Sequence, residues 1–213
     1  MVDVSLEKRV FEENDRIAAE NRALFLERGI KAVNLIGSPG SGKTTLLETT
    51  LRRLKGAGVR PAVVEGDLET SRDAERIQAL GIPAVQINTR GGCHLDANQV
   101  SGALKELPLD AVDVLFIENV GNLVCPMEYD LGEQAKVIVL SVTEGHDKPI
   151  KYAGAFHLCA AVVVSKSDLL PHTDFDLGAA REDLRRINPD IAVMPLSAKT
   201  SDGMEAWLDW LAC

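Results

Sequence analysis

Apolar residues along the chain follow two patterns, short continuous runs and longer stretches with helical spacing. The short runs are rich in Val and Ile, which is typical of strands that are buried on both faces of a parallel sheet. They cover residues 32–37, 61–67, 83–88, 112–119, 135–142, 160–168 and 191–199. Helices are expected between the last three strands and, from their spacing, at residues 43–54, 70–80 and 96–107. The alternation predicts an α/β fold of three layers, with a mostly parallel sheet covered by helices on both sides.

The N-terminal segment carries a helical pattern without a following strand. Apolar side chains recur at mostly helical spacing among many charges, at Leu6, Val10, Ile17, Leu24 and Phe25. Glu and Asp are too frequent in this segment for a basic helix that lies on a membrane. We therefore expect residues 1–29 to form a helix that packs on a single domain made by residues 30–213.

Composition narrows the class of protein. The 213 residues suit one α/β domain, and the 46% of hydrophobic residues are enough for a buried core. No apolar run approaches the roughly 20 residues of a membrane span, and the charged N-terminus lacks the apolar segment of a secretory signal. A net charge of −9 argues against a nucleic-acid partner. Four cysteines are too few for a disulfide framework, so we expect a reduced, cytoplasmic setting.

The stretch "GSPGSGKTT" joins the first predicted strand to the first long helix. It matches the phosphate-binding motif G-x-x-x-x-G-K-[ST] in the strand–loop–helix context that the motif requires, which disfavours the alternative of a chance glycine-rich turn. Lys43 would reach the β- and γ-phosphates, the Thr44 hydroxyl would bind Mg²⁺, and the helix N-terminus would add its dipole. The expected phosphate-binding residues are Gly37, Gly40, Ser41, Gly42, Lys43, Thr44 and Thr45.

Two carboxylates at the ends of predicted strands are candidates to complete the Mg²⁺ site. Glu118 ends "VLFIE" and precedes Gly121, which resembles a D-x-x-G element with Glu in place of Asp. Asp67 ends "VVEGD", with Glu65 close by, and could also orient the attacking water. A solvated carboxylate is the alternative for both, but the carboxyl edge of a parallel sheet is where ligands gather. The expected Mg²⁺ ligands are Thr44, Asp67 and Glu118, and the expected catalytic residues are Lys43, Asp67 and Glu118.

Two further elements indicate which base is bound. "SKSD" ends a buried strand and resembles the N-K-x-D element of GTPases, with Ser165 at the first position. Asp168 can accept hydrogen bonds from guanine N1–H and the N2 amino group, and the Lys166 stem would lie along the base. "LSAKT" resembles the S-A-K loop, which predicts base contacts at Ser197, Ala198 and Lys199. Either element alone is weak, but their order after the phosphate loop favours GTP.

Three soft-to-borderline donors form a candidate metal site. Cys93 and His94 follow the predicted strand 83–88, and Cys125 lies beyond the next strand along the chain, which we expect to be adjacent. Packing is the usual role of an isolated cysteine, and a Cys–His nucleophile is a second alternative. Two thiolates and an imidazole suit Zn²⁺ or Ni²⁺, and three ligands leave an open position for exchange. The remaining cysteines are expected to be a buried small residue, Cys159, and a chain tail, Cys213.

Several motifs together resemble one known family. The phosphate loop, "EGDLETSRDAERI", "GGCHLDA", "ENVGNLVCP", "EGHDKPIKY" and the S-A-K loop are similar to those of the hydrogenase nickel-incorporation GTPases, the HypB family, from about residue 30 onward. The resemblance implies a P-loop NTPase fold of the signal-recognition/MinD-like class. It also implies a nucleotide-dependent homodimer with Ni²⁺ or Zn²⁺ at the interface, held by Cys93, His94 and Cys125. Implied partners are nickel-delivery proteins and the large-subunit precursor of [NiFe]-hydrogenase. The N-terminal C-x-x-C-G-C motif and the His-rich stretch of some members are absent from this sequence.

The predicted function is a slow GTPase, converting GTP and water to GDP and phosphate, whose nucleotide state controls dimerisation and metal binding. Gly121, where a γ-phosphate would be sensed, shortly precedes Cys125, so a switch ordered by γ-phosphate and Mg²⁺ would carry a metal ligand. Lys148 is expected to bind nucleotide, across the dimer. The alternatives are a urease-type accessory GTPase that binds nickel or zinc, a metal chaperone clamped by unhydrolysed nucleotide, and a small-molecule P-loop kinase, for which no arginine-rich lid stands out.

Overall fold

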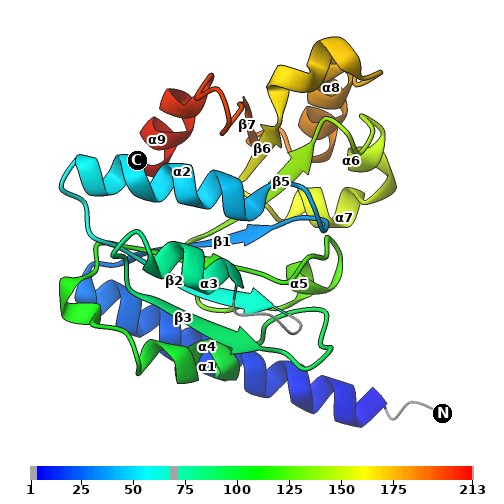
Figure 1. Ribbon diagram of the computed structural model, residues 1–213. Helices are drawn as coiled ribbons and strands as arrows, with labels where there is room; N and C mark the ends of the chain where they lie inside the picture. Colours follow the sequence, from blue (N-terminus) through cyan, green and yellow to red (C-terminus); the bar gives the residue numbers. More distant parts are fainter. Residues whose placement is uncertain (1–3, 68–71, 213) are drawn as a thin grey trace.

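The computed structural model describes residues 4–67 and 72–212 (Figure 1). One sheet has the strand order β3-β2-β4-β1-β5-β6-β7, and every neighbouring pair runs parallel. The strands are β1 (Lys31–Ile36), β2 (Pro61–Asp67), β3 (Ala84–Asn88), β4 (Val114–Glu118), β5 (Ala135–Ser141), β6 (Ala161–Ser165) and β7 (Ala192–Pro195). The predicted sheet is therefore confirmed, and within the described residues it is wholly parallel.

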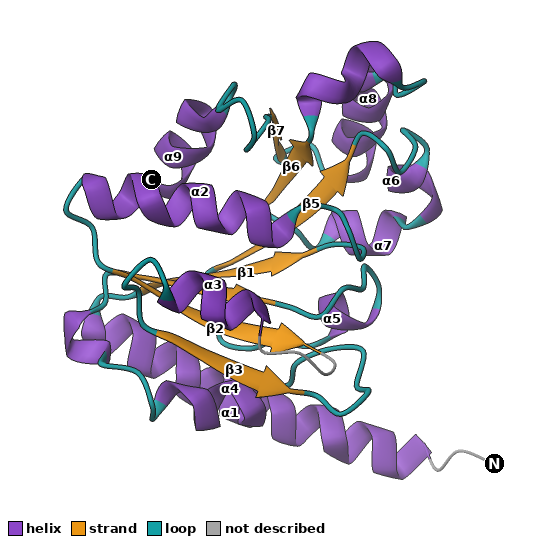
Figure 2. Cartoon of the chain, in the orientation of Figure 1, coloured by secondary structure: helices purple, strands orange, loops and turns teal. Residues whose placement is uncertain are grey.

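Helices cover both faces of the sheet, which confirms the three layers (Figure 2). One face buries apolar side chains of α2 (Lys43–Gly56), α3 (Arg72–Gln78) and α9 (Met204–Ala212). The other face buries those of α1 (Val4–Arg28), α4 (Ala97–Leu104), α5 (Cys125–Glu128), α7 (Ala153–His157) and α8 (Leu177–Ile187). The remaining helical segments are α6 (Lys148–Lys151), which contacts α8, and the 3-10 turns η1 (Leu109–Ala111) and η2 (Ser167–His172).

The central strands are buried on both faces as predicted, but the two edge strands are not. Side chains of β3 and β7 are mostly half-buried, because each edge strand has a neighbour on one side only. Two predicted strands also end early. Lys166 takes a left-handed conformation (φ 58°) that stops β6 at Ser165. β7 ends at Pro195, whose ring nitrogen faces the open edge of the sheet, because the N–H groups of Ala192 and Leu196 are the ones that donate to β6.

The predicted N-terminal helix is present as α1, which packs against α4 in the third layer (Figure 1). Phe25 and Ala18 are fully buried there, whereas Val10 is 49% exposed, so the apolar stripe is narrower than predicted. The Asn14 side chain joins α1 to the domain by donating to the Asp130 carbonyl (2.9 Å) and accepting from the Ala97 N–H (2.9 Å). The division of the chain into residues 1–29 and 30–213 stays a prediction.

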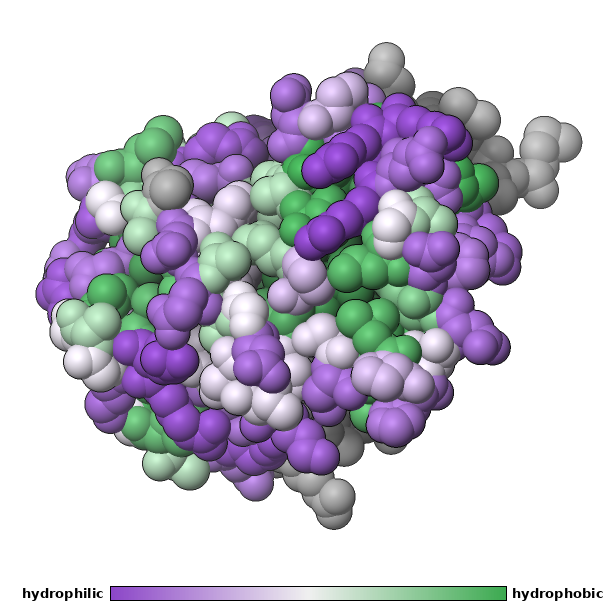
Figure 3. All heavy atoms as spheres, turned by 90° about the horizontal axis from the view of Figure 1, so that it is seen from above, coloured by the Kyte–Doolittle hydropathy of each residue, from purple (hydrophilic) through white to green (hydrophobic). Residues whose placement is uncertain are grey.

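Some predicted features lie outside the described residues: Met1–Asp3 of the N-terminal unit, the start of the helix predicted at 70–80, and Cys213. Across the described ranges, none of the helices has the length and apolarity needed to span a membrane. The face of the molecule seen from above shows mostly hydrophilic side chains with smaller apolar areas between them (Figure 3).

Candidate nucleotide and metal site

The phosphate loop lies between the end of β1 and the start of α2, as its motif predicts. Gly42 precedes α2 in the left-handed region (φ 95°, ψ 20°), which turns the backbone so that the helix N-terminus opens into the loop. The Lys43 ammonium lies over the loop, donating to the carbonyl oxygens of Gly37 (3.1 Å) and Ser38 (3.5 Å). This side chain is only 7% exposed, and phosphate oxygens are the anionic acceptors that its position suits.

The loop meets the end of β4 through one short hydrogen bond. The Thr44 hydroxyl lies 2.7 Å from Glu118 Oε1, and Glu118 is 4% exposed. A hydroxyl and a carboxylate are hard oxygen donors of the kind that Mg²⁺ prefers, so this pair fits the ion. Asp67 lies at the end of β2, on the strand next to β4, and is half-buried. The role of Asp67 as a Mg²⁺ ligand or orienter of water stays a prediction.

Glu65 is a further candidate for the cation site, which the sequence indicated only as a carboxylate close to Asp67. It lies opposite Glu118 in the β2–β4 register and is 3% exposed. Two buried carboxylates side by side near the phosphate loop concentrate negative charge where a cation would be stabilised. The signal in the sequence was a Glu inside an otherwise apolar strand.

The predicted base-binding residues line one cavity of about 250 Å³ beside the phosphate loop. Its walls include Gly42, Thr45, Lys166, Asp168, Ser197, Ala198 and Lys199. The Lys166 ammonium donates to the Gly40 carbonyl (2.7 Å), so this side chain spans from the base pocket to the loop. The structure thus brings the two elements predicted to read the base together with the phosphate loop, and their binding of a base stays a prediction.

Ser165, which occupies the Asn position of the N-K-x-D element, contacts the phosphate loop by a hydrogen bond. Its hydroxyl donates to the Ser41 carbonyl at 2.6 Å, and the side chain is 4% exposed. A hydroxyl has one proton to donate, whereas an amide has two. The loop is therefore anchored at this point by a single hydrogen bond from residue 165.

Lys148 contacts the phosphate loop within the same chain. Its ammonium donates to the Ser38 hydroxyl (2.5 Å) and forms an ion pair with Glu144. The side chain is thus close enough to the loop to meet a nucleotide bound in this subunit. A contribution across a dimer stays a prediction.

The three predicted metal ligands come together at the carboxyl edge of the sheet. Ligand atoms of Cys93, His94 and Cys125 all lie within 4.8 Å of one another, and Cys93 Sγ lies 3.5 Å from His94 Nδ1. The expectation that β3 and β4 are adjacent is wrong, because β2 lies between them. The loop after β3 reaches Cys125 by crossing the end of β2 at Gly66. A Cβ on Gly66 would lie 2.8 Å from the Leu95 side chain, so only glycine leaves room for this crossing.

The donor set favours a metal site over a nucleophile, because the Cys125 thiol lies beside the Cys93–His94 pair. The hydrogen bond with Cys125 and then burial raise the pKa of the Cys93 thiol, so its neighbours do not activate it as a nucleophile, and a bound cation would have to stabilise the thiolate that ligates a metal. Burial lowers the pKa of His94, which keeps the imidazole neutral and able to bind a metal. Cys159 is buried, and burial raises the pKa of its thiol to about 12, so it is the inert small residue that was expected.

Tyr129 is a neighbour of the cluster that the sequence reasoning missed. Its ring stacks on the His94 ring with centroids 3.8 Å apart and planes 21° apart. The stack fixes the orientation of an imidazole that could otherwise rotate away from the two thiols. The only signal in the sequence was an aromatic residue one helical turn after Cys125.

The chain is similar to known proteins over nearly its whole length. The model of the CobW/HypB/UreG nucleotide-binding domain matches residues 31–195. Hydrogenase maturation factor HypB of Azotobacter chroococcum is 53% identical over 209 residues, which are 98% of this chain and 68% of that protein. Hydrogenase/urease maturation factor HypB of Helicobacter pylori is 39% identical over 98% of this chain and 87% of that protein.

Among solved structures, HypB from Helicobacter pylori in complex with nickel superposes with a TM-score of 0.89. It is 39% identical, and the match covers 94% of each chain. Sequence, fold and the phosphate loop agree on one assignment. The chain belongs to the HypB family of hydrogenase maturation factors, which are P-loop GTPases of the CobW/HypB/UreG group.

Proposed function

We propose that this chain is a GTP-hydrolysing metallochaperone that helps insert nickel into a [NiFe]-hydrogenase precursor, and that its nucleotide state controls dimerisation and metal binding. Nickel is the cargo, held by Cys93, His94 and Cys125, and Zn²⁺ is a competitor suited to the same donors. Three protein ligands leave a coordination position open, which suits a site that must release its metal.

One observation carries the proposal: a single short segment joins the two sites. It begins at Glu118, which bonds Thr44 of the phosphate loop, and ends at Cys125, which meets Cys93 and His94. Between them, Gly121 lies against Pro39 of the phosphate loop, where an added Cβ would be 3.0 Å from the proline ring. A rearrangement of the phosphate loop on GTP binding therefore acts on a segment that carries a metal ligand.

For hydrolysis, a water oxygen attacks the γ-phosphorus and the bond to the β–γ bridging oxygen breaks, which yields GDP and phosphate. Lys43 lies over the phosphate loop where it would neutralise the β- and γ-oxygens. Thr44 and Glu118 would hold Mg²⁺, which supplies further neutralisation of the phosphates. Asp67 and Glu65 are the candidates to orient the water. Turnover is slow in this proposal, in keeping with a switch rather than a metabolic enzyme.

The test compares metal affinity in two nucleotide states. Apparent Kd values for Ni²⁺ and Zn²⁺ are measured with GDP and with a non-hydrolysable GTP analogue, alongside the oligomeric state by light scattering. We expect the affinities to differ between the two states, and Cys125→Ala to lose metal binding in both. Cys159→Ala is the matched control, because Cys159 is buried away from the cluster. Equal wild-type affinities in both states would contradict the proposal.

Two alternatives are separated by the same protein samples. A nucleotide-clamped chaperone would release no phosphate in a single-turnover assay with GTP under any metal condition. A urease-type role is suggested by the hydrogenase/urease maturation factor among the relatives. Metal transfer to a urease apoprotein, with none to a hydrogenase large-subunit precursor, would favour that role.

A further inference from the structure

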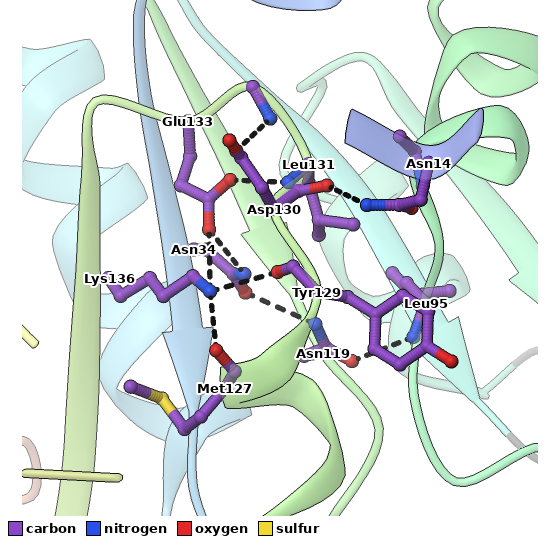
Figure 4. Close-up of polar contacts among 12 residues, drawn as sticks. Asn14, Asn34, Leu95, Asn119, Met127, Tyr129, Asp130, Leu131, Glu133 and Lys136 are labelled. Atoms are coloured by element: carbon purple, nitrogen blue, oxygen red, sulfur yellow. Dashed lines mark hydrogen bonds and ion pairs between the residues drawn. The ribbon is translucent and has the colours of Figure 1, made fainter. Parts of the chain in front are cut away.

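A buried chain of hydrogen bonds links Leu95, Asn119, Asn34, Glu133 and Lys136 (Figure 4). At its centre, Asn119 Oδ1 accepts from the backbone N–H of Leu95 (3.1 Å) and of Val120 (3.0 Å). The Asn119 amide donates to Asn34 Oδ1 (3.3 Å). Asn119 is 1% exposed and Asn34 is fully buried. Buried amides are tolerated only when such bonds are made, so this arrangement is specific rather than incidental.

The chain of hydrogen bonds continues from Asn34 to the segment that carries Cys125. Asn34 Nδ2 donates to Glu133 Oε1 (3.0 Å), and Glu133 Oε1 lies 3.9 Å from the Lys136 ammonium. Lys136 in turn donates to the backbone carbonyls of Met127 (2.8 Å) and Tyr129 (2.9 Å). These carbonyls belong to the end of α5, which otherwise leaves its last acceptors unsatisfied.

At both ends of this hydrogen-bond chain, side chains bind backbone groups that lie next to the predicted metal ligands. Leu95 directly follows His94, and Met127 and Tyr129 follow Cys125 by about half a turn and one turn of α5. Tyr129 also stacks on the His94 ring. Asn119 directly follows Glu118, the carboxylate bonded to Thr44. The Cys–His arm, the Cys125 arm and the phosphate loop are thus joined through one set of buried polar groups.

We propose that Asn119 is a positioning residue for the metal cluster, and that the buried chain Asn119–Asn34–Glu133–Lys136 makes metal affinity depend on the bound nucleotide. The inference rests on the proposed function. A shift of the β4 end on nucleotide binding moves Asn119, which pulls on the Leu95 N–H and, through Asn34, on the groups that hold α5. Partners that orient metal ligands through hydrogen bonds typically change metal affinity by about 10- to 100-fold when removed.

Three substitutions interrupt the hydrogen-bond chain at different points. Asn119→Ala removes the acceptor of the Leu95 N–H and the link to Asn34. Asn34→Ala cuts the chain in the middle but leaves Asn119 bonded to Leu95. Lys136→Met frees the Met127 and Tyr129 carbonyls from the other end. Thr50→Val is the control, because its buried hydroxyl bonds Trp207 (2.8 Å) in the helix layer on the opposite face of the sheet.

The experiment measures apparent Kd for Ni²⁺ and Zn²⁺ by chelator competition, with GDP and with a non-hydrolysable GTP analogue plus Mg²⁺. Hydrogen–deuterium exchange at Leu95 serves as a readout that needs no metal. We expect Asn119→Ala to weaken metal binding about 10-fold and to speed exchange at Leu95. In all three variants of the hydrogen-bond chain, the ratio of the metal affinities measured with GDP and with the GTP analogue should move toward one. Asn34→Ala should lose the least metal affinity of the three. Thr50→Val should keep the wild-type affinity and ratio.

The outcomes separate this inference from the proposed function. If wild-type protein has the same metal Kd with GDP and with the GTP analogue, the proposed function is contradicted. A higher metal Kd for Asn119→Ala than for wild type would then still support the positioning role. Wild-type affinity and ratio in folded Asn119→Ala and Lys136→Met would overturn the inference, whatever their stability in urea. If Asn119→Ala does not fold, Lys136→Met still tests the inference. Lys136 is the last member of the hydrogen-bond chain and its side chain is partly exposed, so its replacement should be tolerated better.

Discussion

Replacing Ser165 with alanine tests whether the phosphate loop is held ready for nucleotide by one hydrogen bond. The Ser165 hydroxyl donates to the Ser41 carbonyl at 2.6 Å from a position that is 4% exposed. A buried hydrogen bond contributes about 0.5–1.5 kcal/mol net. If that energy holds the loop in its binding conformation, its loss lowers the population of competent loop, and the apparent Kd for GDP rises by roughly 2- to 10-fold.

Fluorescence titration with a labelled GDP gives the Kd, and urea unfolding gives the free energy of unfolding of the same samples. Ser141→Ala is the matched control, because Ser141 is a buried serine opposite Ser165 in the β5–β6 register and its hydroxyl lies 2.8 Å from that of Thr143. We expect the control to lose stability while keeping the wild-type Kd. A lower unfolding free energy for Ser165→Ala with an unchanged Kd would refute the reasoning, since the bond would then stabilise the fold without preparing the loop.

Three further predictions concern the Mg²⁺ pair, the metal cluster and pH. Glu118→Gln should lower Mg²⁺-dependent GTP hydrolysis by roughly 100-fold while GDP binding in EDTA is kept; an unchanged rate would exclude Glu118 from the site. Tyr129→Leu removes the stack on His94 and should weaken Ni²⁺ binding about 2- to 10-fold, whereas Tyr129→Phe should bind as wild type; equal Kd values for both would contradict a role for the ring. The hydrogen bond from Arg60 holds the pKa of Asp113 at about 2, below its ordinary 3.8. Because the folded pKa is depressed, the ionised Asp113 adds stability above about pH 4 that is lost as the pH falls toward 2. Asp113→Asn should therefore be slightly less stable than wild type above pH 4 and close to it near pH 2, with a small difference because the pair is exposed to solvent. A loss that persists at pH 2 would contradict the ion pair as its cause.

Much of the fold was readable from the sequence because the central strands are fully buried. A continuous apolar run specifies a strand covered on both faces, and β1, β4, β5 and β6 all follow this rule. Strand ends were less predictable, since they depend on backbone conformation at single residues. The left-handed backbone conformation at Lys166 decided where β6 stops.

The parts of the site that depend on neighbours in sequence were predicted as well. The phosphate loop is such a part, because its glycines, Lys43 and Thr44 act through one short stretch of backbone. The three predicted metal ligands do lie close together, although β3 and β4 are not adjacent as expected. Cys93 and Cys125 meet across β2, and Gly66 provides the room that the Leu95 crossing needs.

The sequence by itself determined the strands and the phosphate loop, because local hydrophobicity and fixed spacing suffice for these, and it supplied the three candidate metal ligands. Only the tertiary structure showed that Glu118 bonds Thr44, since this contact depends on β4 lying next to β1. The same holds for Tyr129 on His94 and for Asn119 beneath Leu95. Their partners are distant in sequence, and a hydrogen bond or ring stack leaves no periodic pattern by which the sequence could show it.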